Sequence, residues 1–199
     1  MKIAFIAEGR TEKVFGRHLV RFLEPRLAGG MPRLSPHIYD GRIPTGERLK
    51  RVVERLLNEA DAVIALTDVY TGTREFVNAT HAKEKMREWV GPEGRFHPHA
   101  AQHDFEAWLL PYWPDIQRLS GSNRTAPPGN PEAVNHDNPP AHRIGDVFRT
   151  GAARRSYVKP RDAHRILEGK DLAIAAARCG ELKALLNTIL SLCGGDLIP

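Results

Sequence analysis

The segment K-I-A-F-I-A-E-G-R-T-E, residues Lys2–Glu12, decides the fold. After Lys2 it is apolar until Glu8 and Gly9, which is typical of a short central strand buried on both faces of a parallel sheet. From Glu12 to Leu27 the apolar residues recur at helical spacing. The chain is therefore predicted to begin with a strand, a short turn and a helix.

A second apolar run, A-V-I-A-L-T at Ala62–Thr67, predicts another central strand, and Asp68 follows it directly. In open α/β sheets, ligands and catalytic side chains gather at the carboxyl ends of strands. Glu8 and Asp68 both stand at such ends, so we expect them to face one crevice. Mg²⁺ takes oxygen ligands and keeps several waters, so one or two carboxylates plus a substrate phosphate make a suitable site. Gly9 permits a tight turn and close backbone approach, and the helix N-terminus near Thr11 supplies N–H donors for an anion.

The other periodic segments predict strands and helices in alternating order. Strands are expected at an outer position ending in His37–Tyr39 and at Phe96–Gln102. Helices are expected at Arg48–Ala60, Asn78–Val90, Phe105–Leu110, His142–Phe148, Ala163–Leu167 and Glu181–Leu192. Residues 121–140 are rich in Gly, Pro, Asn and Ser, which predicts a long surface loop and a candidate lid. We expect an α/β core with a mostly parallel sheet flanked by helices over residues 1–120, with a loop and helical C-terminal elaboration over residues 121–199 packed on that core.

Composition narrows the class of protein. Of 199 residues, 41% are hydrophobic and 27% are charged, which is ordinary for a folded globular domain. The formal net charge of +5 favours a polyanionic partner such as DNA or RNA, because neutralising phosphates releases counterions. The N-terminal apolar run is too short for a signal sequence or a membrane span, which predicts a cytoplasmic protein without membrane contact. Cys179 and Cys193 lack CxxC spacing, which argues against a disulfide framework and a structural zinc site.

The order of strand, E-G-x-T-E, helix and a later strand ending in Asp resembles the TOPRIM fold of topoisomerases, primases and overcoming-lysogenization-defect (OLD) nucleases. Two further motifs, H-D-F-E-A-W-L-L at His103–Leu110 and S-Y-V-K-P at Ser156–Pro160, are similar to the TOPRIM-like domain-of-unknown-function family 4276. The resemblance covers nearly the whole chain. It implies a Rossmann-like TOPRIM fold and an Mg²⁺- or Mn²⁺-dependent nuclease acting on DNA or RNA phosphodiesters. The likeness to ATPase-coupled nucleases implies an ATPase partner and a role in bacterial defence against phage or plasmids.

The resemblance also assigns metal ligands. Glu8 matches the TOPRIM glutamate, a metal ligand or general base, and Asp68 matches the first aspartate of the Asp-x-Asp pattern. Tyr70 stands where the second aspartate is expected, which puts two-metal cleavage in doubt. Asp104 and Glu106 are candidates to supply the missing charge, and one metal with fewer ligands can still act as a Lewis acid.

Two more residues complete the catalytic set that the resemblance implies. Glu12, in the E-G-x-T-E motif, is expected to support the metal site. Lys159, in S-Y-V-K-P, is expected to stabilise the charge that develops on the phosphate during transfer.

Structural roles stay open for several of these residues. Glu12 lies in the first helical turn, where the helix dipole alone favours a carboxylate, and Asp104 is equally suited to cap the helix that follows it. The basic segment Arg154–Arg161 either contacts phosphates or forms a solvated edge. The departure at Tyr70 also leaves open a catalytically weakened binding module for nucleic acid or nucleotides, docked on an ATPase partner.

A zinc-dependent hydrolase is a third hypothesis. His97 and His99 form an H-x-H pair on one face of the expected strand, with His103 nearby, and imidazole suits zinc and other transition metals. No glutamate-bearing zinc-protease motif accompanies them.

Overall fold

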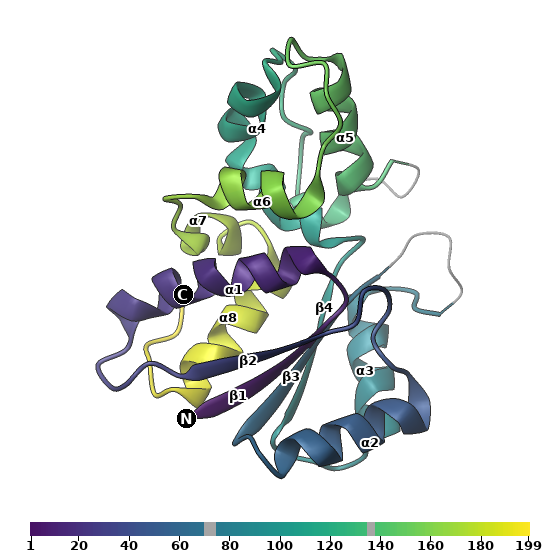
Figure 1. Cartoon of the computed structure of the whole chain (residues 1–199), viewed down its shortest axis with the longest axis vertical. Helices are drawn as coiled ribbons and strands as arrows, with labels where there is room; N and C mark the ends of the chain where they lie inside the picture. The colour runs from purple at the N-terminus through teal and green to yellow at the C-terminus, as the bar shows by residue number, and fades with distance from the viewer. Residues whose placement is uncertain (70–74, 135–137) are drawn as a thin grey trace.

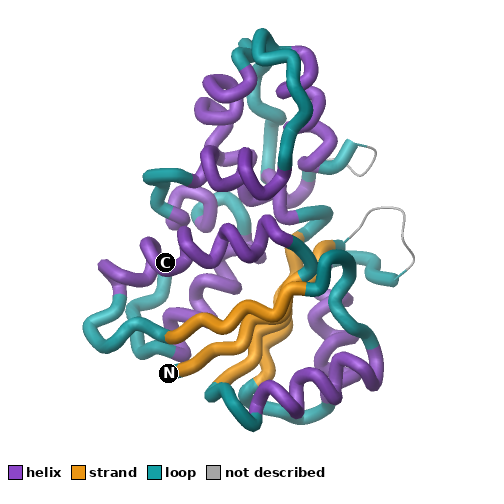
Figure 2. The backbone as a smooth tube through the Cα atoms, viewed as in Figure 1, coloured by secondary structure: helices purple, strands orange, loops and turns teal. Residues whose placement is uncertain are grey.

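The computed structural model describes residues 1–69, 75–134 and 138–199. In this part of the chain the strands form one four-stranded parallel sheet with the order β2-β1-β3-β4 (Figure 2). The strands are β1 (Lys2–Ala7), β2 (Arg33–Ile38), β3 (Ala62–Asp68) and β4 (Phe96–Ala101). The predicted α/β fold with a parallel sheet is therefore confirmed.

The two apolar runs of the sequence form the two central strands. Every residue of β3 is buried, and so is every residue of β1 after Lys2, because helices cover both faces of the sheet. The outer strand β2 is half-buried and contains Pro36, which is tolerated at a sheet edge where one side of the backbone has no partner strand. β2 ends at Ile38, within the predicted end of the outer strand at His37–Tyr39.

The helices divide between the two faces of the sheet (Figure 1). Alternate residues of β1 pack against α1 (Arg10–Leu23) and α8 (Gly180–Leu192), and the residues between them pack against α2 (Gly46–Leu57) and α3 (Ala79–Val90). This follows from the period of two in a strand. A short 3₁₀ helix, η1 (Glu24–Arg26), ends the first helical stretch.

A group of short helices extends from the end of β4 and lies beyond α1 (Figure 1). The group contains η2 (Phe105–Tyr112), α4 (Trp113–Ser120), η3 (Pro131–Ala133), α5 (Pro140–Thr150), α6 (Lys159–Leu167) and α7 (Leu172–Ala176). The sequence did not predict α4 or α7, because helices of eight and five residues are too short to give a clear periodic pattern. The division into residues 1–120 and 121–199 stays a prediction. None of the described helices is both long and apolar enough to cross a membrane.

Candidate functional site

The carboxyl ends of β1 and β3 lie side by side at the centre of this sheet. β1 leads through α1 to β2 on one side, whereas β3 leads through α3 to β4 on the other side. Open α/β sheets bind ligands where the strand order reverses in this way. Glu8 directly follows β1 and Asp68 is the last residue of β3, so the topology brings the two predicted metal ligands to the same point.

Glu8 and Asp68 are held together by hydrogen bonds. The Thr67 hydroxyl and the Asp68 backbone N–H both donate to Oε1 of Glu8, the latter at 3.2 Å. Both carboxyl side chains are buried, with Glu8 4% and Asp68 6% exposed. These donors fix the Glu8 carboxylate against the end of β3.

Gly9 brings a third carboxylate close to the same strand end. A Cβ atom on Gly9 would lie 3.1 Å from Oε2 of Glu12, so any larger residue would crowd that carboxylate. The backbone of Gly9 is extended, with φ −141°, so the glycine serves close approach and not the tight turn that the sequence suggested. Glu12 is buried in the first turn of α1 and points toward the start of the helix.

Two further carboxylates follow β4. His103 has a φ of 72°, in the left-handed region that non-glycine residues adopt rarely, and the chain turns there from β4 into η2. Asp104 and Glu106 come next and are 5% and 1% exposed. Asp104 occupies the N-cap position of η2 but makes no side-chain cap; its Oδ2 instead accepts the backbone N–H of Ala141 at 3.1 Å. Its Oδ1 is buried without a hydrogen-bond partner among the described residues.

Lys159, at the start of α6, reaches this cluster from the helical group. Its Nζ lies 3.2 Å from Oε2 of Glu106. The Tyr157 hydroxyl lies 3.4 Å from Oε1 of the same carboxylate. Half of the Lys159 side chain is exposed, so the ammonium group borders both the cluster and solvent.

The pKa values show how crowded this negative charge is. Burial, followed by repulsion from Glu12 and Glu8, raises the pKa of Asp68 well above its usual range. Burial, reinforced chiefly by the Glu106 carboxylate, raises the pKa of Glu12 and of Asp104 to about 7 each. Burial lowers the pKa of Lys159, but the surrounding carboxylates outweigh it and the pKa is raised overall. The site therefore favours added positive charge.

The donor chemistry suits a hard divalent cation. Carboxylate oxygens are the ligands that Mg²⁺ prefers, and the buried Oδ1 of Asp104 is available for a ligand bond. No three His, Cys, Asp or Glu side chains in the described ranges are grouped so as to hold a metal ion by themselves. Mg²⁺ does not require such a group, because it is commonly bound by one or two carboxylates, waters and substrate phosphates.

Tyr70 and the histidines of the zinc hypothesis were also singled out from the sequence. Tyr70 lies outside the described residues. His97 Nε2 and His99 Nδ1 are buried without partners in the described part of the chain, and burial lowers the pKa of His99 to about 3, so this imidazole is neutral. The same part of the chain contains no third ligand grouped with them, so the structure gives the zinc hypothesis no support.

Comparison with known proteins places the chain in a family. Residues 7–190 match the family described as "Domain of unknown function (DUF4276)". The chain belongs to the DUF4276 family. No curated protein matches it in sequence.

The DUF4276 chain also resembles a solved structure, the C-terminal region of the Burkholderia pseudomallei OLD protein. The TM-score is 0.56 and the sequence identity is 13%, with 96% of this chain and 98% of that chain covered. At this identity the likeness concerns the fold alone. It agrees with the OLD-like TOPRIM fold that the strand-end motifs suggested.

Three contacts of the DUF4276 site were not predicted from the sequence. The Thr67 hydroxyl, the Tyr157 hydroxyl and the Ala141 N–H each contact a carboxylate of the cluster. Thr67 could have been suspected, because it precedes Asp68 in a strand that is otherwise apolar. The Ala141 contact joins residues 37 positions apart and leaves no pattern in the sequence.

Proposed function

We propose that this DUF4276 chain is an Mg²⁺-dependent nuclease that hydrolyses phosphodiester bonds. One observation carries the proposal. Glu8, Glu12, Asp68, Asp104 and Glu106 are all buried at the carboxyl ends of β1, β3 and β4, beside Lys159. Buried carboxylates in such number are costly for a fold unless a cation compensates them.

The residues divide into roles by position. Glu8 and Asp68 would hold Mg²⁺, or Mn²⁺ in its place, together with waters and the substrate phosphate, and Asp104 and Glu106 would add negative charge nearby. The cation would polarise the phosphoryl oxygen and offset its charge. Glu12, with a pKa near 7, is suited to take a proton from the attacking water, because a general base works best when its pKa lies near the operating pH. Lys159, oriented by Glu106, offsets negative charge on the phosphate as the bond to the leaving oxygen breaks.

DNA or RNA is the proposed substrate, in keeping with the net charge of +5. The likeness to one region of an OLD protein, together with the resemblance to ATPase-coupled nucleases, supports an ATPase partner and a role in phage or plasmid defence. The proposed location is the cytoplasm.

Cleavage of plasmid, single-stranded DNA and RNA, measured with Mg²⁺ or Mn²⁺ and with chelator, tests the proposal. Glu8→Gln and Asp68→Asn should each lower the rate by about 100-fold or more, since each removes a ligand charge at nearly constant volume. Glu54→Gln, an exposed change on α2, is the matched control and should keep the wild-type rate.

Wild-type cleavage rates in both folded site variants would overturn the assignment. Nucleic-acid and metal binding without turnover would instead identify the weakened binding module.

A further inference from the structure

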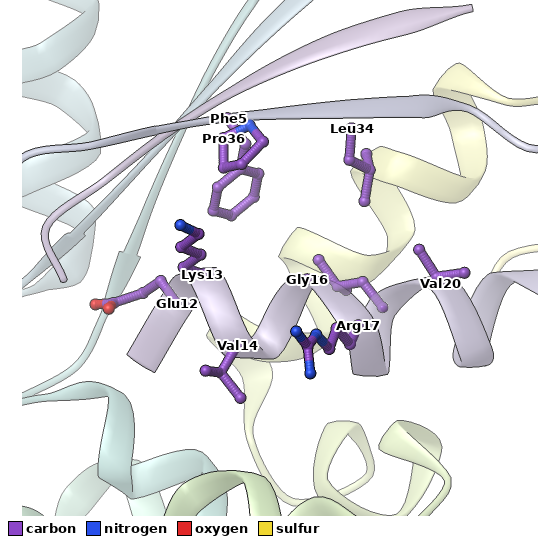
Figure 3. Close-up of a pocket in the computed structure, with 10 residues that line it drawn as sticks. Phe5, Glu12, Lys13, Val14, Gly16, Arg17, Val20, Leu34 and Pro36 are labelled. Carbon is purple, nitrogen blue, oxygen red and sulfur yellow. The ribbon is translucent and has the colours of Figure 1, made fainter. Parts of the chain in front are cut away.

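A cavity of about 340 Å³ lies between α1 and the edge strand β2 (Figure 3). Phe5, Leu34 and Pro36 face α1 from the sheet. Val20, on α1 itself, extends the apolar lining at one end of the cavity. Sites for small ligand groups begin at about 300 Å³, so the cavity can take one. Glu12 stands at the opposite end from Val20, and its side chain belongs to the carboxylate cluster as well. The cavity is therefore adjacent to the candidate active site.

Gly16 keeps part of this space open. It lies inside the 14-residue helix α1, where glycine is less favourable than alanine because it loses more backbone entropy on folding. Its φ is not in the positive range, and a Cβ atom there would meet no atom within 4 Å. Neither the backbone nor the packing requires glycine at this position. A larger residue would project into the cavity instead.

Two cations border the cavity from the same helix. Lys13 and Arg17 line it, are exposed, and form no ion pair with any residue in the described ranges. They lie one turn apart, where like charges repel each other. Arg10, one turn earlier, is by contrast paired with Asp40 at 3.4 Å. An apolar cavity bordered by two unneutralised cations complements a flat, weakly polar group attached to an anionic chain.

We propose that the cavity holds the base and sugar of one nucleotide of a single-stranded nucleic acid, with Lys13 and Arg17 on the neighbouring phosphates. The proposal rests on the nuclease function and specifies its substrate class. The apolar side chains accept the face of any base, so binding depends little on sequence. Paired bases in a duplex are stacked and cannot enter. A strand anchored here would continue past Glu12, which brings the next phosphate to the carboxylate cluster.

Binding measured by fluorescence anisotropy with chelator present tests the cavity without turnover. The probes are labelled oligothymidylate and oligouridylate, the same strands with abasic central nucleotides, and a duplex of equal length. Wild type should bind the intact single strands about tenfold more tightly than the abasic ones, as expected when one base is bound. Gly16→Leu should bind intact and abasic strands equally, because the leucine side chain fills the cavity. Gly16→Ala should be more stable than wild type and keep most of the ratio.

The charge contacts have their own controls. Lys13→Ala and Arg17→Ala should each reduce the slope of log affinity against log salt concentration by about one unit. Arg21 is an exposed residue of the same helix that lies outside the cavity, so Arg21→Ala should leave this slope unchanged. Equal binding of intact and abasic strands, or an unchanged ratio in folded Gly16→Leu, would overturn the proposal even if metal-dependent cleavage is found. Base-dependent binding without cleavage would support the cavity and count against the nuclease.

Discussion

Glu12 and Asp104 show, at the scale of single residues, how burial and crowded negative charge change the acidity of the site. Burial and nearby carboxylates raise the pKa of each to about 7, far above the value of an exposed carboxyl. Burial and repulsion both disfavour the charged form. Near neutral pH each of these two residues is therefore partly ionised, and its charged form lowers the stability of the metal-free fold.

This makes stability depend on pH in a defined direction. Between about pH 4.5 and pH 7 the folded protein binds more protons at Glu12 and Asp104 than the unfolded chain does, so stability falls as pH rises through this range. We expect urea unfolding with chelator to give a free energy of unfolding lower at pH 8 than at pH 5, by on the order of 3 kcal/mol for each of the two groups acting alone. Saturating Mg²⁺ at pH 8 should recover much of the loss, because a ligand that binds only the folded state stabilises it.

Glu12→Gln is the control variant and should have a shallower pH dependence, since it removes one of the two titrating groups. His18 acts in the opposite direction: burial, then His164, lowers its pKa to about 4, so protonation of the unfolded chain removes stability as pH falls below about 6.5. His18 contributes equally to both proteins, so it cancels when the free energy of unfolding of Glu12→Gln is subtracted from that of wild type. If this difference in free energy does not change with pH, the pKa of Glu12 is not raised in the folded protein.

At the scale of elements, Asp162 stabilises the start of α6. Lys159 is the first residue of this helix, so Asp162 also fixes where Lys159 lies. The carboxylate is fully buried, accepts the Val158 N–H at 2.8 Å, and receives both terminal nitrogens of Arg155 at 2.7 and 3.1 Å. Arg155 also lies over the Phe148 ring, 4.5 Å from its centroid. Arg155 is therefore partly buried and held by Asp162, which differs from a solvated edge, while phosphate contact by the basic segment stays a prediction.

Asp162→Ala should lower the free energy of unfolding by about 3 kcal/mol, because it leaves a partly buried guanidinium and a helix N-terminus without their acceptor. Asp146→Ala is the matched control on α5: it removes an exposed ion pair with Arg149 and should cost less than about 1 kcal/mol. Urea denaturation measures both. Equal losses in the two variants would mean that the buried pair does not hold α6.

The elements that the sequence predicted well are those whose burial is uniform. β1 and β3 are apolar on both faces, so they and the strand-end residues Glu8 and Asp68 could be located from a local pattern. The partners of Arg155 could not, because Arg155 and Asp162 differ by seven positions across a loop and only the fold brings them together. The resemblance alone singled out Lys159 and Glu106, and their contact, which spans 53 positions, leaves no local pattern in the sequence.

At the scale of the whole molecule, one hydrophobic core joins the sheet to the C-terminal helices. The core on the α1 face of the sheet includes Phe5 and Leu66 together with Phe148, Ile166 and Leu186. α8 covers the sheet beside α1, although it comes at the end of the chain (Figure 1). We infer that residues 121–199 are part of the same folding unit as residues 1–120.

A chain ending at residue 120 should therefore fail to fold cooperatively. It would lose α8, whose buried face consists of Leu182, Leu185, Leu186, Ile189 and Leu190. Each exposed leucine or isoleucine costs about 1.5–3 kcal/mol, so their sum rivals the whole stability of a typical domain. Urea unfolding followed by circular dichroism should show one transition for the full chain and none for residues 1–120. A chain ending at Leu192 retains α8 and should unfold cooperatively, whereas a cooperative transition in residues 1–120 would show that the sheet folds without its C-terminal cover.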